Sequence, residues 1–109
     1  MNQRLCAYDD IEEDGSIAIE ATVNGEPAQL MLIRKDGLVY AYKNICPHIG
    51  APLDFTPGQF LNAERNFIMC STHGALFQIE DGLGVSGPCQ GQSLESVPCQ
   101  ISEDSVWID

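Results

Sequence analysis

Two short motifs, each with one cysteine followed by one histidine, constrain this chain more than any other feature. The first is Cys46-Pro47-His48 and the second is Cys70-Ser71-Thr72-His73. A glycine follows each histidine closely, Gly50 in the first motif and Gly74 in the second, and the sequence has no further histidine. Two thiolates and two imidazoles that converge on one point make a four-ligand metal site. The fold must then bring together two loops that are separated by residues 49–69.

The ligand types indicate which redox chemistry such a site suits. In a centre of two ferric ions and two sulfides, two thiolates cancel the remaining positive charge, and neutral imidazoles add none. Four thiolates would leave the centre negative before any electron arrives. An electron is therefore easier to add when two histidines replace two cysteines, and reduction potentials rise to about −150 to +300 mV, from about −400 mV for plant-type centres with four cysteines.

A structural zinc site is the main alternative for these ligands, because tetrahedral zinc also accepts two cysteines and two histidines. Zinc modules usually present their cysteines as a C-x2-C pair and their histidines with H-x3–5-H spacing. This chain instead has mixed C-x-H and C-x2-H motifs, each followed by a glycine. The spacing therefore favours an iron–sulfur centre over zinc.

Length and charge limit the classes of partner. A chain of 109 residues is expected to form one domain, over residues 1–109. Sixteen acidic residues against five basic ones give a net charge of −11. Such a field repels nucleic acid and anionic membranes and favours docking to a basic protein surface. We expect a monomer that binds neither nucleic acid nor membrane.

The remaining cysteines and the N-terminus bear on location. Cys6, Cys89 and Cys99 lack the paired spacing of a secreted disulfide framework, and we expect them to be small buried apolar side chains. No apolar run approaches the roughly 18–20 residues of a spanning helix, and the N-terminus has no signal-peptide pattern. The sequence therefore predicts a cytoplasmic protein.

Short strands separated by turns are predicted along the whole chain. The turn dipeptides accept positive φ angles and are Asp14-Gly15, Asn24-Gly25, Asp36-Gly37 and Asp81-Gly82. The strand-like runs are Ser16–Val23, Ala28–Arg34, Leu38–Lys43, Phe67–Cys70, Leu76–Ile79, Leu94–Val97 and Val106–Ile108.

No segment has a convincing helical repeat, so the predicted fold is all-β, a small antiparallel sandwich or barrel. In the first of these runs, Ile17, Ile19 and Ala21 alternate with polar or small residues, as in a half-buried strand. The metal-binding subdomain, at about residues 45–88, is inserted between strands. It is expected to form a lobe on a framework built from both ends of the chain.

The segments Cys46–Leu53 and Cys70–Phe77 resemble the two cluster-binding boxes of Rieske-type ferredoxins, the soluble electron carriers of ring-hydroxylating dioxygenase systems. Ser86-Gly87-Pro88 is similar to the proline loop of that family. With the flanking strands, the resemblance extends over essentially the whole chain and implies a Rieske-type β fold.

The resemblance also implies one [2Fe–2S] cluster per chain, with Cys46 and Cys70 on one iron and His48 and His73 on the other. Around these ligands, Gly50 and Gly74 are expected to let the backbone approach the cluster and donate N–H groups to sulfur, and Pro88 to lie over it. One departure is the spacing between the boxes, which is longer than usual. The extra residues fall in Asp54–Asn66, which is expected to be a longer hairpin or surface loop that could border the cluster.

Comparison within the family places the expected potential low. High-potential members carry an extra cysteine in each box, joined as a disulfide, whereas Ala51 and Thr72 stand at the matching positions here. Those members also use a serine and a tyrosine hydroxyl as hydrogen-bond donors near the cluster, where this chain has Ala75 and Phe77. Fewer donors stabilise the reduced state less, so we expect a potential near or below about −150 mV.

The resemblance implies a carrier of single electrons, from a flavin-dependent ferredoxin reductase to a terminal, aromatic-ring-hydroxylating oxygenase, through transient electrostatic complexes. The chain is not expected to be an enzyme. A Rieske oxygenase needs a further iron held by two histidines and a carboxylate, and His48 and His73 are already used. The alternative function is a regulatory module whose cluster senses oxidants or iron supply.

Overall fold

The regular structure of this chain is almost entirely antiparallel β-sheet. The computed structural model describes residues 3–47, 50, 53, 58–70, 74–87 and 90–108. Its strands are β1 (Gln3–Ala7), β2 (Gly15–Val23), β3 (Glu26–Lys35), β4 (Leu38–Lys43), β5 (Phe67–Cys70), β6 (Ala75–Gln78), β7 (Gly84–Ser86), β8 (Cys99–Ser102) and β9 (Ser105–Ile108). A three-residue 3-10 turn, η1 (Tyr8–Asp10), follows β1. None of the described segments forms a helix with the length and apolarity needed to span a membrane.

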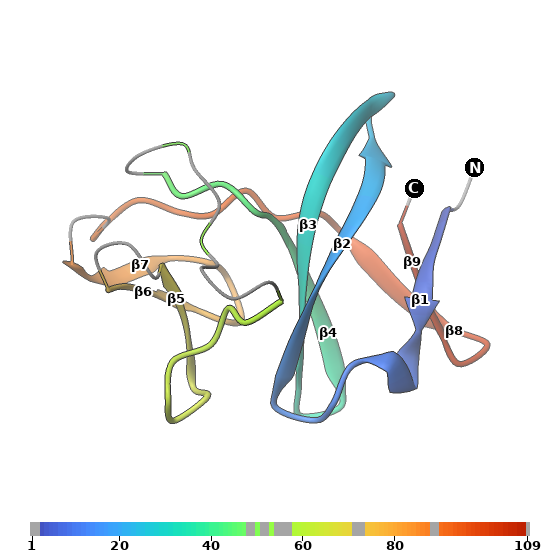
Figure 1. The fold of residues 1–109 in the computed structure, drawn as a ribbon, viewed down its shortest axis with the longest axis horizontal. Coiled ribbons are helices and arrows are strands. Elements are labelled where there is room, and N and C mark those ends of the chain that lie inside the picture. The colour runs from blue at the N-terminus through green and yellow to red at the C-terminus, as the bar shows by residue number, and fades with distance from the viewer. Residues whose placement is uncertain are drawn as a thin grey trace.

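The strands form three antiparallel three-stranded sheets, ordered β1-β9-β8, β2-β3-β4 and β5-β6-β7. The first sheet joins the two ends of the chain, and together with the second it makes a framework. The third sheet forms a separate lobe at the other end of the molecule (Figure 1). The strands of the lobe lie between β4 and β8 in the chain, and the framework contains strands from both ends of the chain.

Tight two-residue turns fix the register of the framework hairpins. Asn24 and Gly25 join β2 to β3 with φ angles of 53° and 82°, and Asp36 and Gly37 join β3 to β4 with 54° and 80°. Positive φ at both central positions is the mark of a type I′ turn, whose twist matches that of the flanking strands. The alternation predicted for β2 is also found, with Ile17 and Ile19 half-buried.

Several predicted strands differ from the observed ones, and those at Ser16–Val23, Ala28–Arg34 and Val106–Ile108 extend by one to three residues as β2, β3 and β9. The segment at Leu94–Val97 is not a strand and makes one isolated bridge, between Ser96 and Tyr42. Pro98 follows it directly and has no N–H to continue a ladder. The predicted strand Leu76–Ile79 lies one residue earlier, at Ala75–Gln78. Strands β1, β7 and β8 were not predicted, because they are short and lack clear apolar alternation.

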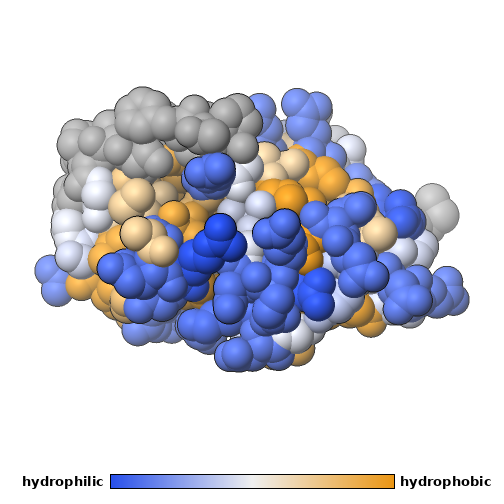
Figure 2. Space-filling view, turned by 60° about the horizontal axis from the view of Figure 1, so that its bottom comes forward, coloured by the Kyte–Doolittle hydropathy of each residue, from blue (hydrophilic) through white to orange (hydrophobic). Residues whose placement is uncertain are grey.

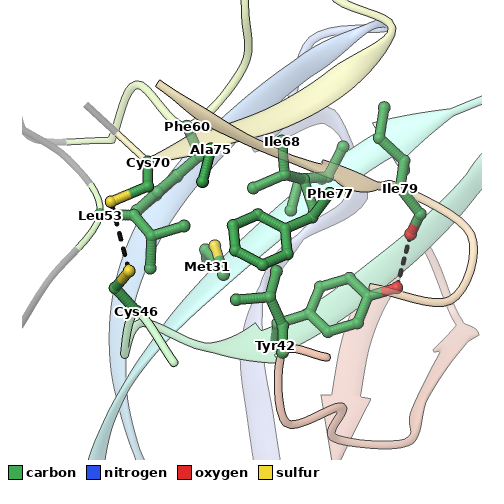
Figure 3. Packing of buried hydrophobic residues seen from close by; sticks show 12 residues of the cluster. Met31, Tyr42, Cys46, Leu53, Phe60, Ile68, Cys70, Ala75, Phe77 and Ile79 are labelled. Carbon is green, nitrogen blue, oxygen red and sulfur yellow. Dashed lines mark hydrogen bonds between the residues drawn. The ribbon is translucent and has the colours of Figure 1, made fainter. Parts of the chain in front are cut away.

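Strand β3 is buried on both faces and links two cores. Leu30 and Leu32 are fully buried in the framework core, whereas Met31 and Ile33 are fully buried in the core that joins β3 and β4 to the lobe. Successive side chains of a strand point to opposite faces, so a continuous apolar run can serve two cores at once. Figure 3 shows the second core, which we call the lobe core.

The longer hairpin expected within Asp54–Asn66 is found in its described part, residues 58–66. The Met69 N–H donates to the Phe60 carbonyl at 2.7 Å, and Leu61 bridges Ile68. This hairpin therefore adds a short antiparallel partner to the lobe sheet beside β5.

Candidate metal centre

The thiols of Cys46 and Cys70 meet in the lobe core. Their Sγ atoms are 3.4 Å apart, although the residues are far apart in sequence. Both side chains are at most 1% exposed. Cys70 is the last residue of β5, and Cys46 follows shortly after β4, which ends at Lys43. Figure 3 shows the two sulfurs facing each other, with Leu53 beside them.

The sulfur separation suits two thiolates on one metal ion. A disulfide would bring the sulfurs to about 2.05 Å. A tetrahedral metal with bonds of about 2.3 Å to sulfur sets two thiolates about 3.8 Å apart. The observed 3.4 Å between Cys46 and Cys70 is close to the second geometry. The donor set and the burial of both sulfurs therefore fit an iron or zinc ion bound between two loops.

Each cysteine begins a turn that is closed by the glycine of its own motif. The Gly50 N–H donates to the Cys46 carbonyl at 2.7 Å, and the Gly74 N–H donates to the Cys70 carbonyl at 2.9 Å. The φ angles of the two glycines are 71° and 69°, in the left-handed region that favours glycine. The two glycines thus make the same hydrogen bond, and their N–H groups donate to the cysteine carbonyls, where donation to sulfur was expected.

A buried asparagine anchors the first motif, and the sequence offered no signal for it. Asn44 is 5% exposed, and its Oδ1 accepts a hydrogen bond from the Leu53 N–H at 2.8 Å. Its own N–H donates to the Gln29 carbonyl at 2.8 Å. Asn44 therefore joins Leu53, on the far side of Cys46, to Gln29 in β3.

A glycine lets the segment after β7 pack closely on β6. A Cβ on Gly87 would lie 2.9 Å from the Cα of Ala75, which no real contact allows, and its φ is 81°. Ala75 directly follows Gly74 and is fully buried. Gly87 therefore holds the start of the predicted proline loop against the second motif.

Tyr42 of β4 links the turn after β6 to the framework through a hydrogen bond. It is 2% exposed, and its hydroxyl donates to the Ile79 carbonyl at 2.5 Å (Figure 3). Burial, with a smaller effect of Asp81, raises the pKa of Tyr42 well above its usual value. The phenol therefore stays protonated and keeps its donor role.

His48, His73 and Pro88 lie outside the described residues. Their assignment as ligands and as a cover therefore stays a prediction, as does the assignment of Cys46 and Cys70 to one iron. Cys89 also lies outside the described residues. Of the other cysteines, Cys6 is buried as expected, and Cys99 is half-buried with its thiol donating to the Val39 carbonyl at 3.2 Å. Burial raises the pKa of both thiols.

Comparison with known proteins decides the family. The sequence pattern of the Rieske [2Fe-2S] domain matches residues 1–100 of this chain. The chain belongs to the Rieske [2Fe-2S] domain family. Its cofactor is therefore a Rieske-type [2Fe–2S] cluster, and the zinc alternative loses its support.

Proteins similar to this Rieske domain include ferredoxins, one of them a component of an alkene monooxygenase system. The chain is 28% identical over 104 residues to the ferredoxin component of the alkene monooxygenase system of Xanthobacter autotrophicus (strain ATCC BAA-1158 / Py2), covering 95% of this chain and 77% of the relative. Among solved structures, it resembles the Sphingomonas yanoikuyae B1 ferredoxin, with a TM-score of 0.75, 26% identity, and coverage of 100% and 98%.

A second solved structure agrees in fold. The ferredoxin of carbazole 1,9a-dioxygenase from Nocardioides aromaticivorans IC177 has a TM-score of 0.78 at 23% identity, covering 99% of this chain and 96% of the other. The match runs over nearly the full length of both ferredoxins. The two chains therefore share one fold, and the two relatives of higher identity are named as ferredoxins, which are electron-transfer components.

The basic residues of this Rieske domain are largely engaged with its own acidic groups. Arg34 pairs with Glu13 at 3.3 Å, Lys35 pairs with Glu80 at 3.6 Å, and Lys43 with Glu95. The other carboxylates greatly outnumber the basic residues. Figure 2 shows one face of the molecule, on which hydrophilic side chains gather along the lower part with apolar patches between them.

Proposed function

We propose that this Rieske domain carries single electrons from a flavin-dependent ferredoxin reductase to a terminal oxygenase. The observation that carries the proposal is the meeting of the Cys46 and Cys70 sulfurs, 3.4 Å apart and buried, in a chain that matches ferredoxins over nearly its whole length. When bound, the cluster accepts and donates one electron at a time. The chain's own residues hold it and shield it from water.

The proposed ligands are Cys46 and Cys70 on one iron and His48 and His73 on the other. The turns closed by Gly50 and Gly74 fix the backbone directions at the two cysteines. Burial of both sulfurs keeps water from competing for the metal. The Gly87 contact with Ala75 supports the proposal that Pro88 covers the same end of the lobe.

The proposed partner surface lies beside the first motif. Ile45 directly precedes the buried Cys46, and 51% of its surface is exposed. The Lys43–Glu95 ion pair lies two residues away along the chain. Transient interfaces combine an apolar centre with a polar rim, so this surface offers a partner an apolar contact next to a proposed ligand.

Charge sets the expected chemistry of the partner. With a net charge of −11, the chain attracts a basic face on the reductase or oxygenase and repels its own copies, which supports a monomer in transient complexes. It also repels nucleic acid. The free thiols of Cys6 and Cys99 are consistent with a reducing compartment, and we propose the cytoplasm.

The terminal acceptor is proposed by similarity. One solved structure is the complex of reduced oxygenase and oxidized ferredoxin in carbazole 1,9a-dioxygenase. This chain matches a chain of that structure with a TM-score of 0.75. An aromatic-ring-hydroxylating oxygenase is therefore the proposed acceptor. The relationship to an alkene monooxygenase ferredoxin makes an alkene-oxidising system the second candidate.

Anaerobic stopped-flow kinetics tests the proposal. The oxidised protein should be reduced by NADH in the presence of a flavin-dependent ferredoxin reductase and be reoxidised by a terminal oxygenase, with one electron per chain. A regulatory module would instead change its binding to a partner when the cluster is lost. Failure of any such reductase to reduce a protein that is reducible by dithionite would contradict the carrier role.

A further inference from the structure

The hairpin at residues 58–66 has a rigid turn that lies away from the two sulfurs. The Oδ1 of Asn62 accepts hydrogen bonds from the N–H groups of Asn66 at 3.0 Å and Phe67 at 3.1 Å. Strand β5 then runs from Phe67 to Cys70, and at about 3.3 Å per residue the turn and the thiol are about 10 Å apart along the strand. The turn of this long loop therefore does not border the sulfurs, whereas Phe60, near its start, packs in the same core as both cysteines.

The start of the hairpin instead lies along the outer edge of β2. The Ser16 hydroxyl donates to the Gly58 carbonyl at 2.7 Å and accepts from the Phe60 N–H at 3.2 Å. A Cβ on Gly58 would be 3.7 Å from the Ala18 nitrogen, so the two backbones run in close contact. One hydroxyl thus uses both its donor and its acceptor capacity to join framework and lobe.

This junction continues to a predicted metal ligand. The Phe60 carbonyl accepts a hydrogen bond from the Met69 N–H at 2.7 Å, and Met69 directly precedes Cys70 in β5. The Phe60 side chain is fully buried in the lobe core, together with Cys46 and Cys70. Two successive hydrogen bonds therefore link Ser16 to the backbone next to the Cys70 thiol.

A second contact at the far end of the hairpin supports the same junction. The guanidinium of Arg65 donates to the Asp14 carbonyl at 3.3 Å, and Asp14 directly precedes β2. The hairpin is therefore held to the start of β2 at two points. The Ser16 contact leads through Phe60 to Met69, next to Cys70, whereas Arg65 lies near the other end of β5.

We propose that Ser16 is a positioning residue for the metal centre. It holds β5 against the framework and so keeps the Cys70 thiol at the separation from Cys46 that a shared metal ion needs. The proposal rests on the ligand assignment of the proposed function. It also gives the long segment between the two motifs a role, which is to tie the second motif to β2.

The test compares three variants of the cluster-loaded protein. Ser16→Ala removes both hydrogen bonds, Ser16→Thr restores a hydroxyl, and Ser102→Ala removes an exposed hydroxyl of β8 as a matched control. Three readouts are taken: the rate of iron release to a chelator, the g values of the reduced protein, and the thermal midpoint from Trp107 fluorescence. Trp107 is the sole tryptophan and lies in β9 of the framework.

Ser16→Ala should release iron about tenfold faster, because a part-buried N–H and a carbonyl lose their partner. Its reduced g values should shift, while the Trp107 midpoint stays near that of the wild type. Ser16→Thr should restore the wild-type rate, and Ser102→Ala should change nothing. Iron release at the wild-type rate, or release that rises only in step with framework unfolding, would overturn the proposal. A wild-type protein with no iron–sulfur signal would instead refute the proposed function itself.

Discussion

Two apolar residues of β6 lower the number of hydrogen-bond donors near the metal centre. Ala75 and Phe77 are both fully buried. Ala75 directly follows Gly74 and is in close contact with Gly87. Neither side chain can donate a hydrogen bond. A reduced centre carries additional negative charge, which donors would stabilise. These positions therefore support the expected potential near or below about −150 mV.

Adding one donor at this place should raise the potential. In Ala75→Ser the new hydroxyl can donate toward the centre, and a bond worth about 1 kcal/mol more in the reduced state corresponds to roughly 40 mV for one electron. A redox titration followed by circular dichroism measures the shift. Ala63→Ser, on the exposed hairpin turn, should leave the potential unchanged. An equal shift in both variants would show that the effect is not local.

Gly87→Ala should loosen the segment over the second motif. Its new Cβ would overlap the Cα of Ala75 at 2.9 Å, and its φ of 81° adds strain. Gly25→Ala is a matched control, because its φ is 82° and nothing lies within 4 Å of the new Cβ. Both variants should lose about 1 kcal/mol of unfolding free energy from backbone strain. Only Gly87→Ala should also speed the loss of iron to a chelator, and similar rates in the two variants would contradict the packing role.

At the residue scale, sequence patterns identify the metal-binding residues better than the residues that position them. The approach of Cys46 to Cys70 could be predicted because cysteine and histidine at metal-ligand spacing have few other uses. The roles of Asn44 and Ser16 could not, because each depends on partners that only the folded chain brings near. Asparagine and serine are also common surface residues, so nothing in the sequence separates these two from the others.

At the scale of elements, substitutions on the two faces of β3 should affect different cores. Met31→Ala empties space in the lobe core that contains both cysteines, whereas Leu32→Ala does so in the framework core. Each should cost about 2–5 kcal/mol of unfolding free energy. Met31→Ala should mainly accelerate iron loss, and Leu32→Ala should mainly lower the midpoint seen by Trp107 fluorescence. Identical effects of the two variants on both readouts would show that the cores melt as one.

Turn chemistry explains which elements could be predicted. Asn24-Gly25 and Asp36-Gly37 predicted their hairpins because these dipeptides adopt the positive φ of a type I′ turn. The β8–β9 hairpin uses the same geometry at Glu103 and Asp104, with φ of 52° and 58°, but without glycine. Residues 94–97 have the composition of a strand, yet they run beside β4 with too few paired groups to form one.

At the scale of the whole molecule, charge should govern encounters with partners. The net charge is −11, and added salt shortens the Debye length to about 10 Å at 0.1 M. The bimolecular rate of electron transfer to a basic partner should therefore fall steeply as salt is added, while the potential changes little. Stopped-flow mixing at increasing ionic strength measures this. A rate that is independent of salt would contradict electrostatic docking.

Electron paramagnetic resonance of the purified protein, before and after dithionite reduction, tests the central claim most directly. Iron, sulfide and zinc are quantified on the same sample. The account predicts two irons and two sulfides per chain, a silent oxidised state, and a rhombic reduced signal whose average g lies below the free-electron value. His48→Ala or His73→Ala should abolish or change that signal. A colourless, silent protein with one zinc ion, or an unchanged signal in both histidine variants, would contradict it.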